Sequence, residues 1–330
     1  MNEEKERYAR AAATLNDARL AAQYARTLQR LAGAPQPEGL ILWESELFRR
    51  SRRVGLLAGS FNPLTRAHVA LAQAARGAGR LDAMLWALSV VIVDKERVER
   101  ASLVDRLLQM RAFVEDGPDA LALFNRGLYV EQAELAWSLM PHLEELVIVV
   151  GFDKIIQIFD PRYYEDRDAV LDRLFASATI LVAPRVDEDE ESLNALLTRP
   201  ENRRYQARVG FCPLPRRFRG DSSSRARSLA SEPGSGRQLR ALLPPEGRAL
   251  VRLTGAYTYG ARRAGRAQRQ RDVYPLRQSV IEQLAALDPA QVAAAPGLDG
   301  LLKRRKDHLS ARRAHVSELE RTSRSSEERG

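Results

Sequence analysis

The chain has 330 residues, of which 45% are hydrophobic, and it carries a formal net charge of +9. This length and composition suit one large α/β domain with appendages or two ordinary domains, and they exclude a chain that is disordered throughout. A single cysteine, Cys212, excludes an intrachain disulfide and a cysteine-cluster metal site, and it fits a reducing compartment. Because no uninterrupted apolar run approaches the roughly 20 residues of a membrane span, we expect a cytoplasmic protein without a membrane partner.

The positive charge is concentrated near the C-terminus. Residues 261–330 hold 15 Lys and Arg against 9 Asp and Glu, which is two thirds of the net excess. The remainder of the chain is therefore only mildly basic. We interpret the tail as a solvated region and do not expect a nucleic-acid partner.

The first 53 residues are expected to form a helical N-terminal extension. Apolar residues between 15 and 31 recur at helical spacing, and a Gly- and Pro-containing stretch at 33–39 ends the pattern. A short apolar segment at 40–48 then leads into the main domain, and its Trp43 and Phe48 are expected to pack on that domain.

Residues 54–260 alternate apolar runs with helical patterns. Strands are expected at 54–58, 84–93, 143–151, 179–185 and 209–214. The alternation is typical of an α/β fold with a doubly wound, Rossmann-like parallel sheet, in which ligands bind beyond the carboxyl ends of the strands. His68, Asp153 and Arg185 follow such ends.

Residues 261–330 are expected to form a basic, helical and partly mobile C-terminal extension. An amphipathic pattern covers 273–287, and a second helical pattern covers 291–302. The Ser-, Arg- and Glu-rich end that follows is expected to be mobile.

The stretch 54–68 has the pattern of a strand, a loop and a helix start. The apolar run ends at Gly59, Asn62 and Pro63 interrupt the chain, and Thr65 leads to His68 as the pattern becomes helical. A loop at a helix N-terminus presents backbone N–H groups and a positive dipole end. The sequence therefore predicts an anion site here, suited to a phosphate.

A second segment, at 222–227, reads Ser-Ser-Ser-Arg-Ala-Arg. Serines at a helix start can cap the helix or bind phosphate, and Arg227 can reach oxygens beside them. Taken alone, the segment is equally well interpreted as an Arg-rich loop.

Four segments together resemble the nucleotidyltransferase α/β superfamily. Residues 59–68 read Gly-Ser-Phe-Asn-Pro-Leu-Thr-Arg-Ala-His, and they look most like the signature of nicotinamide/nicotinate mononucleotide adenylyltransferases. Residues 151–164 resemble the family's Gly-x-Asp segment, 222–227 resemble its Ser-Ser-x-x-x-Arg motif, and 243–247 resemble its closing Val-Pro-x-x-Val segment. The motifs occur in the family's order and cover about residues 54–260.

The resemblance implies transfer of an adenylyl group from ATP to nicotinamide or nicotinate mononucleotide, with release of pyrophosphate, as a step of NAD biosynthesis. Two alternatives stay open: adenylyl or cytidylyl transfer to another phosphorylated acceptor such as phosphopantetheine, and a non-catalytic nucleotide-binding protein. Mg²⁺ would be held by the nucleotide, with no protein metal site. The partners would be small molecules, and a homo-oligomer is left open.

The family's functional residues fall on matching positions. Catalytic roles are implied for Thr65, His68 and Arg227. Binding of ATP is implied for Gly59, Ser60, Phe61, Gly151, Asp153, Ser223 and Ser224. Binding of the acceptor is implied for Asn62, Lys95, Tyr164 and Arg185.

Two regions depart from the family pattern. The residues around Lys95 lack the usual Tyr-Gly-Lys pattern, whereas Arg106 fits the family's Ser-x-x-x-Arg helix. The stretch 111–135 has no counterpart of the tryptophan and threonine segment that grips the pyridine nucleotide. Adenylyl transfer is therefore better supported by the sequence than the identity of the acceptor.

Overall fold

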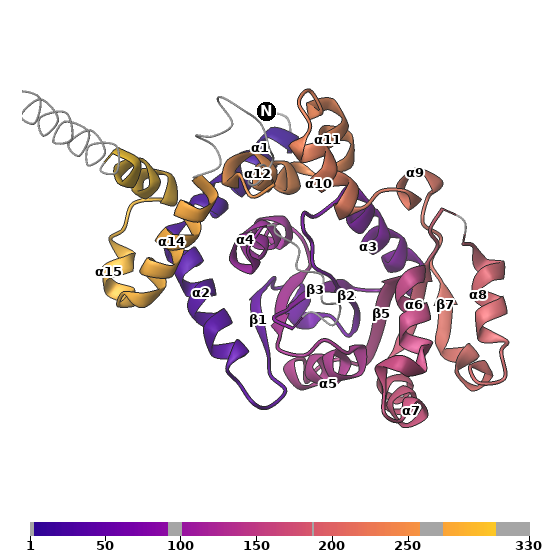
Figure 1. The fold of residues 1–330 in the computed structure, drawn as a ribbon. Helices are drawn as coiled ribbons and strands as arrows, with labels where there is room; N and C mark the ends of the chain where they lie inside the picture. Colours follow the sequence, from indigo (N-terminus) through magenta and orange to yellow (C-terminus); the bar gives the residue numbers. More distant parts are fainter. Residues whose placement is uncertain (1–2, 92–100, 187, 258–272, 308–330) are drawn as a thin grey trace, which may run out of the picture.

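The structure, a computed structural model, describes residues 3–91, 101–186, 188–257 and 273–307. Within these residues, seven strands form one sheet in the order β1-β4-β3-β2-β5-β6-β7 (Figure 1). The strands are β1 Gly39–Glu44, β2 Arg53–Ala58, β3 Ala83–Ser89, β4 Ala120–Phe124, β5 Glu145–Gly151, β6 Thr179–Ala183 and β7 Val209–Phe211. Neighbouring strands are parallel, except that β1 runs antiparallel to β4. The predicted doubly wound α/β sheet is confirmed.

Helices cover both faces of the sheet. Their bounds are α1 Glu3–Asn16, α2 Ala18–Ala32, α3 Arg66–Gly79, α4 Leu103–Val114, α5 Tyr129–Leu139, α6 Phe152–Phe159, α7 Arg167–Ser177, α8 Glu190–Leu197, α9 Arg216–Arg219, α10 Ser223–Ser231, α11 Gly236–Leu242, α12 Pro245–Thr254, α14 Val273–Ala286 and α15 Pro289–Ala293. Short 3-10 turns lie at Phe48–Arg50, Pro161–Tyr163 and Arg203–Arg208. No helix among the described residues is long and apolar enough to cross a membrane.

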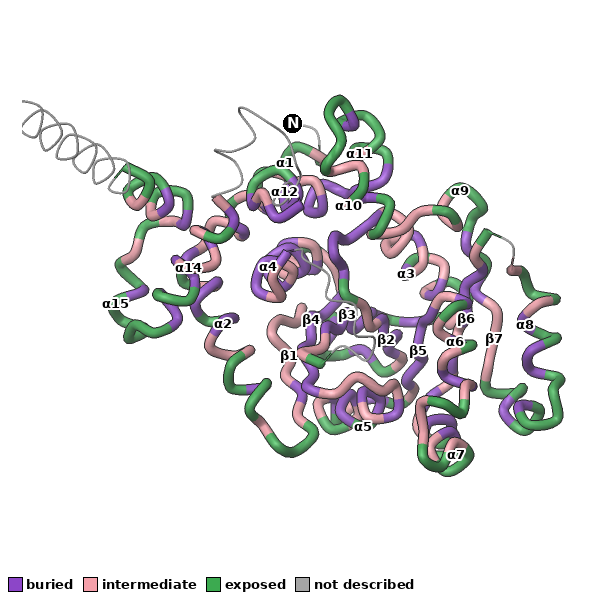
Figure 2. The backbone as a smooth tube through the Cα atoms, in the orientation of Figure 1, coloured by how far each residue is buried: buried purple, intermediate pink, exposed green. Residues whose placement is uncertain are grey.

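The core is divided between the two faces of the sheet, because successive strand residues point to opposite sides. In β5, Val147 and Val149 belong to the cluster that α3 and α4 cover, whereas Ile148 and Val150 belong to the cluster that α5 and α7 cover. Figure 2 shows the interior strands β2 to β6 buried along most of their length, whereas the edge strands β1 and β7 are mostly half-buried. Strands buried on both faces explain the nearly continuous apolar runs in the sequence.

Two strands differ from the sequence-based expectation. Residues 1–53 were expected to be helical, but β1 lies within them and pairs with β4 at the edge of the sheet. β4 itself was not expected: its sequence, Ala-Leu-Ala-Leu-Phe, consists largely of residues that favour helices. Burial between two layers, rather than local propensity, makes this segment a strand.

The C-terminal extension is tied to the N-terminal helices. The expected helix at 273–287 is present as α14, and the guanidinium of Arg277 donates to Asp105 Oδ1 in α4 (2.9 Å) and to the carbonyl of Leu15 in α1 (2.6 Å). Asp105 and Arg277 are 0% and 3% exposed, respectively. The proposed domain boundary near residue 260 lies outside the described residues.

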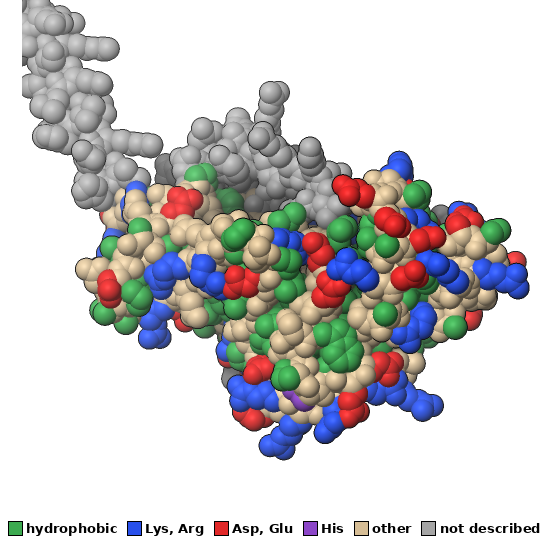
Figure 3. All heavy atoms as spheres, turned by 90° about the horizontal axis from the view of Figure 1, so that it is seen from below, with side chains coloured by type: hydrophobic (Ala, Val, Ile, Leu, Met, Phe, Trp, Pro, Cys, Tyr) green, Lys and Arg blue, Asp and Glu red, His purple; other side chains and the backbone are tan. Residues whose placement is uncertain are grey.

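The surface charges of the described part are mixed. On the face drawn in Figure 3, Lys and Arg side chains are interspersed with Asp and Glu side chains. Exposed ion pairs such as Arg173–Glu134 (2.7 Å) contribute little to stability, because water screens them.

Candidate active site

His68 is held at the start of α3 by a reciprocal cap. Thr65 is the N-cap residue, and its Oγ1 accepts the backbone N–H of His68 at 3.4 Å. The backbone N–H of Thr65 in turn donates to Nδ1 of His68 at 3.0 Å. Because an amide N–H can only donate, Nδ1 carries no proton, and the neutral ring carries its proton on Nε2.

The surroundings of His68 favour this neutral form. Desolvation by burial lowers the pKa of His68 to about 4. The ring packs edge-on against Phe61, with centroids 5.3 Å apart, and Phe61 packs in the same way against Trp86 at 5.6 Å. His68 keeps part of its surface exposed, so a ligand can approach it. At neutral pH the residue is an oriented hydrogen-bond donor, not a cation.

The loop before α3 is braced on one side by α4. Gln109, which is fully buried, donates from Nε2 to the carbonyl of Phe61 (3.0 Å) and accepts the N–H of Leu64 at Oε1 (3.1 Å). Arg106 Nη1 donates to the carbonyl of Ser60 at 3.0 Å. Phe61 has a φ of +41°, a left-handed conformation that is costly for a bulky side chain. The contacts with α4 hold the loop in this conformation.

The same loop is bound from the other side by α10. Ser223 Oγ donates to the carbonyl of Pro63 at 2.8 Å, and Arg227 Nη1 donates to the carbonyl of Asn62 at 2.9 Å. Arg227 Nη2 also donates to Ser224 Oγ at 2.6 Å. The structure therefore brings together three residues of the 222–227 motif and the loop at 59–68.

Two further residues from the C-terminal half complete the loop's surroundings. The hydroxyl of Tyr257 donates to Asn62 Oδ1 at 2.7 Å, so the Asn62 side chain is engaged within the protein. At Gly247 in α12, a Cβ atom would lie 2.5 Å from the carbonyl oxygen of Leu64. The segment 243–247 thus packs directly on the loop, and the contact requires glycine.

Asp153 and Arg185 lie together at the carboxyl ends of β5 and β6. Gly151 is the N-cap residue of α6, Asp153 is in its first turn, and Asp153 forms an ion pair with Arg185. Their side chains are 51% and 43% exposed. None of the hydrogen bonds and ion pairs between described residues joins this pair to the loop at 59–68, so the structure places it at the same sheet edge without direct contact.

The remaining predicted site residues have separate environments. Gly59 donates its N–H to the carbonyl of Ala87 at 3.0 Å, which fixes the start of the loop beside β3. The hydroxyl of Tyr164 donates to the carbonyl of Ile158 at 3.0 Å, and desolvation raises its pKa to about 12. Lys95 lies outside the described residues.

Two solved structures of Plasmodium falciparum nicotinic acid mononucleotide adenylyltransferase, complexed with APC and with NaAD, give TM-scores of 0.42 and 0.43 at 15% and 14% identity. Each comparison covers 61% of this chain and 94% of the solved chain.

No protein-family model matches the sequence. A curated protein of Synechococcus sp. (strain JA-3-3Ab), described as a probable nicotinate-nucleotide adenylyltransferase, is 27% identical over 152 residues. The match covers 42% of this chain and 66% of that relative. The chain resembles a nicotinate-nucleotide adenylyltransferase. The resemblance found in the sequence motifs is therefore confirmed.

Two residues that contact the loop at 59–68, Gln109 and Tyr257, were not predicted from the sequence. Gln109 lies three residues after Arg106 in α4, where a buried amide among apolar residues was a usable signal. Tyr257 gave no signal, because its contact with Asn62 joins residues 195 positions apart.

Metal ligands are not grouped in the described ranges: no three His, Cys, Asp or Glu side chains there could hold an ion together. The oxygens and nitrogens around the loop belong to carbonyl, hydroxyl, amide and guanidinium groups. The hydroxyl, amide and guanidinium groups of this set can donate hydrogen bonds to phosphate oxygens.

Proposed function

We propose that the chain transfers the adenylyl group of ATP to the phosphate of nicotinate or nicotinamide mononucleotide. The products are pyrophosphate and the corresponding dinucleotide, NAD or its deamido form. The observation that carries this proposal is the neutral His68 ring, fixed by Thr65 with its proton on Nε2, in a loop that Arg227 also contacts. The sequence similarity to an adenylyltransferase supports the choice of reaction.

The reaction needs positioned donors more than it needs a protein nucleophile. An oxygen of the acceptor phosphate attacks the α-phosphorus of ATP, the bond to the β-phosphate breaks, and pyrophosphate leaves. Since the acceptor is already an anion, no general base has to activate it. Negative charge accumulates around the α-phosphorus, where the Nε2–H of His68 and the N-terminal dipole of α3 would stabilise it.

The residues of α10 are assigned to the outer phosphates of ATP. Arg227 and Ser224 lie at the N-terminal part of that helix, where its dipole and a guanidinium both favour an anion. The Ser223 hydroxyl already donates to Pro63, so it is left to accept a hydrogen bond, and its main role is to position the loop. Mg²⁺ would arrive with ATP, bound to phosphate oxygens.

The carboxyl ends of β5 and β6 are assigned to the adenosine of ATP and to the acceptor. Gly151 and Asp153 would contact the adenosine, whereas Arg185, Tyr164, Asn62 and Lys95 would contact the acceptor. Gly151 has no atom within 4 Å of a Cβ position, so its surroundings leave space for a ligand. The ion pair holds the Arg185 side chain beside Asp153 at this edge.

We also place the activity in the cytoplasm. One cysteine in 330 residues suits a reducing compartment. Burial raises the pKa of the Cys212 thiol to about 12, so this residue is unreactive.

The direct test is an assay with two acceptors. Purified protein is supplied with ATP, Mg²⁺ and either nicotinate or nicotinamide mononucleotide, and pyrophosphate and the dinucleotide are measured separately. We expect both products in equal amounts with at least one acceptor. Turnover only with phosphopantetheine or another phosphate would replace the acceptor in the proposal. Binding of ATP without turnover of any acceptor would indicate a non-catalytic nucleotide-binding protein.

A further inference from the structure

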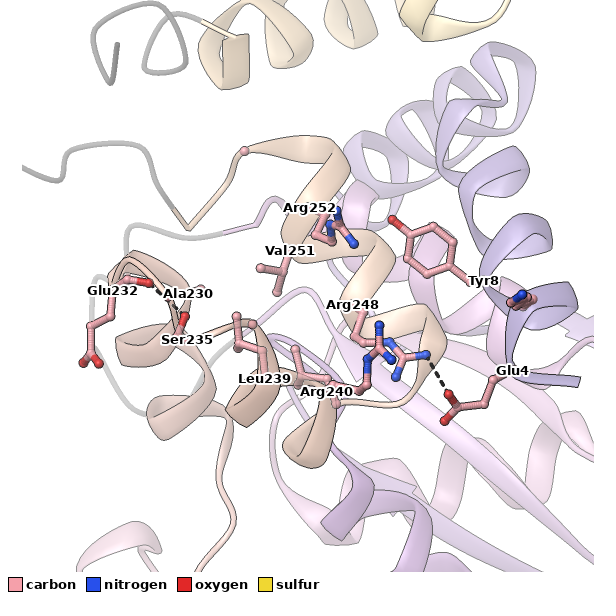
Figure 4. A pocket seen from close by; sticks show the side chains of 15 residues that line it. Glu4, Tyr8, Ala230, Glu232, Ser235, Leu239, Arg240, Arg248, Val251 and Arg252 are labelled. Atoms are coloured by element: carbon pink, nitrogen blue, oxygen red, sulfur yellow. Dashed lines mark hydrogen bonds and ion pairs between the residues drawn. The ribbon is translucent and has the colours of Figure 1, made fainter. Parts of the chain in front are cut away.

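A cleft of about 900 Å³ lies outside the candidate active site, between α1, α11 and α12 (Figure 4). Lys5 and Tyr8 line it from α1, Arg240 from α11, and Arg248 and Arg252 from α12. None of the residues assigned to ATP or to the acceptor lines it. Its volume is in the range of small-molecule sites.

Positive charge dominates the lining of the cleft. Four of the lining side chains are cations, and two, Glu4 and Glu232, are carboxylates. Glu4 is already engaged, since it accepts Arg66 Nη2 at 2.7 Å and Arg248 Nη2 at 3.3 Å. Within the described ranges, Lys5, Arg240 and Arg252 have no ion pair and no side-chain hydrogen bond. The cleft therefore presents unneutralised cations.

Arg248 is the least exposed of the four cations that line the cleft. Its side chain is 13% exposed, and its Nη1 is buried without a hydrogen-bond partner among the described residues. A buried N–H group of a guanidinium without an acceptor costs free energy. The guanidinium shares Glu4 with Arg66, so one carboxylate is divided between two cations and the region keeps an excess of positive charge.

The cleft also has an apolar wall. Tyr8 presents an aromatic side chain from α1, and Leu239 and Val251 line the cleft from α11 and α12. Wide apolar surface beside a few convergent polar groups is typical of sites that bind ring-containing molecules. We propose that this cleft binds a phosphorylated small molecule with a flat ring, its phosphate held by Arg248, Arg240 and Arg252 and its ring packed against Tyr8.

The proposal is tested by calorimetric titration of the full chain with 4-methylumbelliferyl phosphate. The double variant Arg240→Ala/Arg252→Ala removes two exposed side chains of the cleft without breaking a described contact. The matched control, Arg199→Ala/Arg203→Ala, removes two other exposed arginines whose side chains make no described contact. Thermal unfolding of both variants checks that each is folded.

We expect wild type and the control to bind the probe alike, and the cleft variant to bind at least about tenfold more weakly, because hydrogen bonds to charged groups are lost. Methylumbelliferone without phosphate should bind weakly to all of them. His68→Ala and saturating ATP should leave the binding unchanged, which separates the cleft from the candidate active site. Lys5→Gln, which removes one positive charge from the cleft, should weaken binding of the probe by a smaller factor.

Two outcomes would overturn the proposal. One is the absence of measurable binding to the wild-type chain. The other is equal binding to the cleft variant and the control, above all if ATP displaces the probe, since the probe would then occupy the candidate active site.

Discussion

The position of the ring proton of His68 is determined by the backbone. The N–H of Thr65 occupies Nδ1, so the proton of the neutral ring is on Nε2. A cationic histidine would attract phosphate in all directions, whereas this ring donates along one direction only. The cap between Thr65 and His68 thus fixes the direction in which the ring can donate a hydrogen bond.

Replacement of His68 by alanine removes this donor. We expect the turnover number for pyrophosphate release to fall about 100-fold or more, the usual effect of losing a donor to a charged transition state. Binding of ATP should change much less. His142→Ala is the control, because His142 lies just before β5, at the opposite edge of the sheet, and its loss should leave turnover unchanged.

The low pKa of His68 leads to a prediction about pH. Because the pKa is lowered to about 4, the ring should stay neutral between about pH 5 and pH 8. Nitrogen-15 NMR of the histidine rings should show Nδ1 of His68 unprotonated throughout this range. A transition of this ring near its ordinary value of 6.5 would contradict the assignment.

The lowered pKa of His68 also makes the folded protein less stable at acidic pH. The folded pKa lies below the unfolded value, so the unfolded chain binds the proton more readily. The contribution of His68 to the free energy of unfolding is therefore fully present above pH 6.5, and it is lost as the pH falls toward 4. Chemical denaturation at both ends of this range, compared with His68→Ala, measures the contribution.

At the scale of elements, α4, α10 and α12 together determine the shape of the loop at 59–64. Between them they contact successive residues of the loop: α4 binds Phe61 and the N–H of Leu64, α10 binds Pro63, and α12 packs against the carbonyl of Leu64. The loop has few contacts within itself, so its conformation depends on the packing of these helices.

Gly247→Ala tests the contact of α12 with the loop. The new Cβ atom would lie 2.5 Å from the Leu64 carbonyl oxygen, so the helix or the loop has to move. We expect a loss of about 1–3 kcal/mol in the free energy of unfolding, together with lower turnover. Gly77→Ala in α3 meets nothing within 4 Å and should be neutral or slightly stabilising. Equal effects of the two changes would disprove the role of Gly247.

Arg277→Met tests the attachment of α14 to α4. The change leaves the Asp105 carboxylate buried without its cation, and we expect a loss of about 3–5 kcal/mol in the free energy of unfolding. Adding Asp105→Asn should recover part of this loss, because the unpaired charge is removed. The exposed pair offers a control: Arg173→Met should cost about 0–1 kcal/mol. Urea denaturation of the wild type and these three variants measures the differences in the free energy of unfolding.

At the scale of the whole molecule, five of the seven strands were predicted from the sequence, and the two that were missed, β1 and β4, are neighbours at one side of the sheet. The strands β2, β5 and β6 carry Val-, Ile- and Leu-rich runs, which follow from burial on both faces. β1 and β4 carry a weaker signal, because β1 is mostly half-buried and β4 is built largely from Ala and Leu. Their strand character depends on neighbours that are distant in sequence.

In the candidate site, too, contiguous motifs were predicted from the sequence, whereas contacts between distant segments were not. The loop at 59–68 and the motif at 222–227 were recognised because each is contiguous in the sequence. Their mutual contact, the buried Gln109 and the hydroxyl of Tyr257 depend on how the helices pack, which local patterns do not encode. The roles of Asp153, Arg185 and Tyr164 stay predictions, since they contact other protein groups in the structure.

The contacts of the loop have a consequence for synthesis of the protein. Ser223, Arg227 and Tyr257 bind the loop from positions 160, 165 and 195 residues further along the chain. A ribosome makes the loop first and these partners much later. A nascent chain that has just exposed β2 and α3 therefore holds the recognisable motif without the groups that shape it. Nucleotide binding should appear only near the end of translation, when the last third of the chain has emerged.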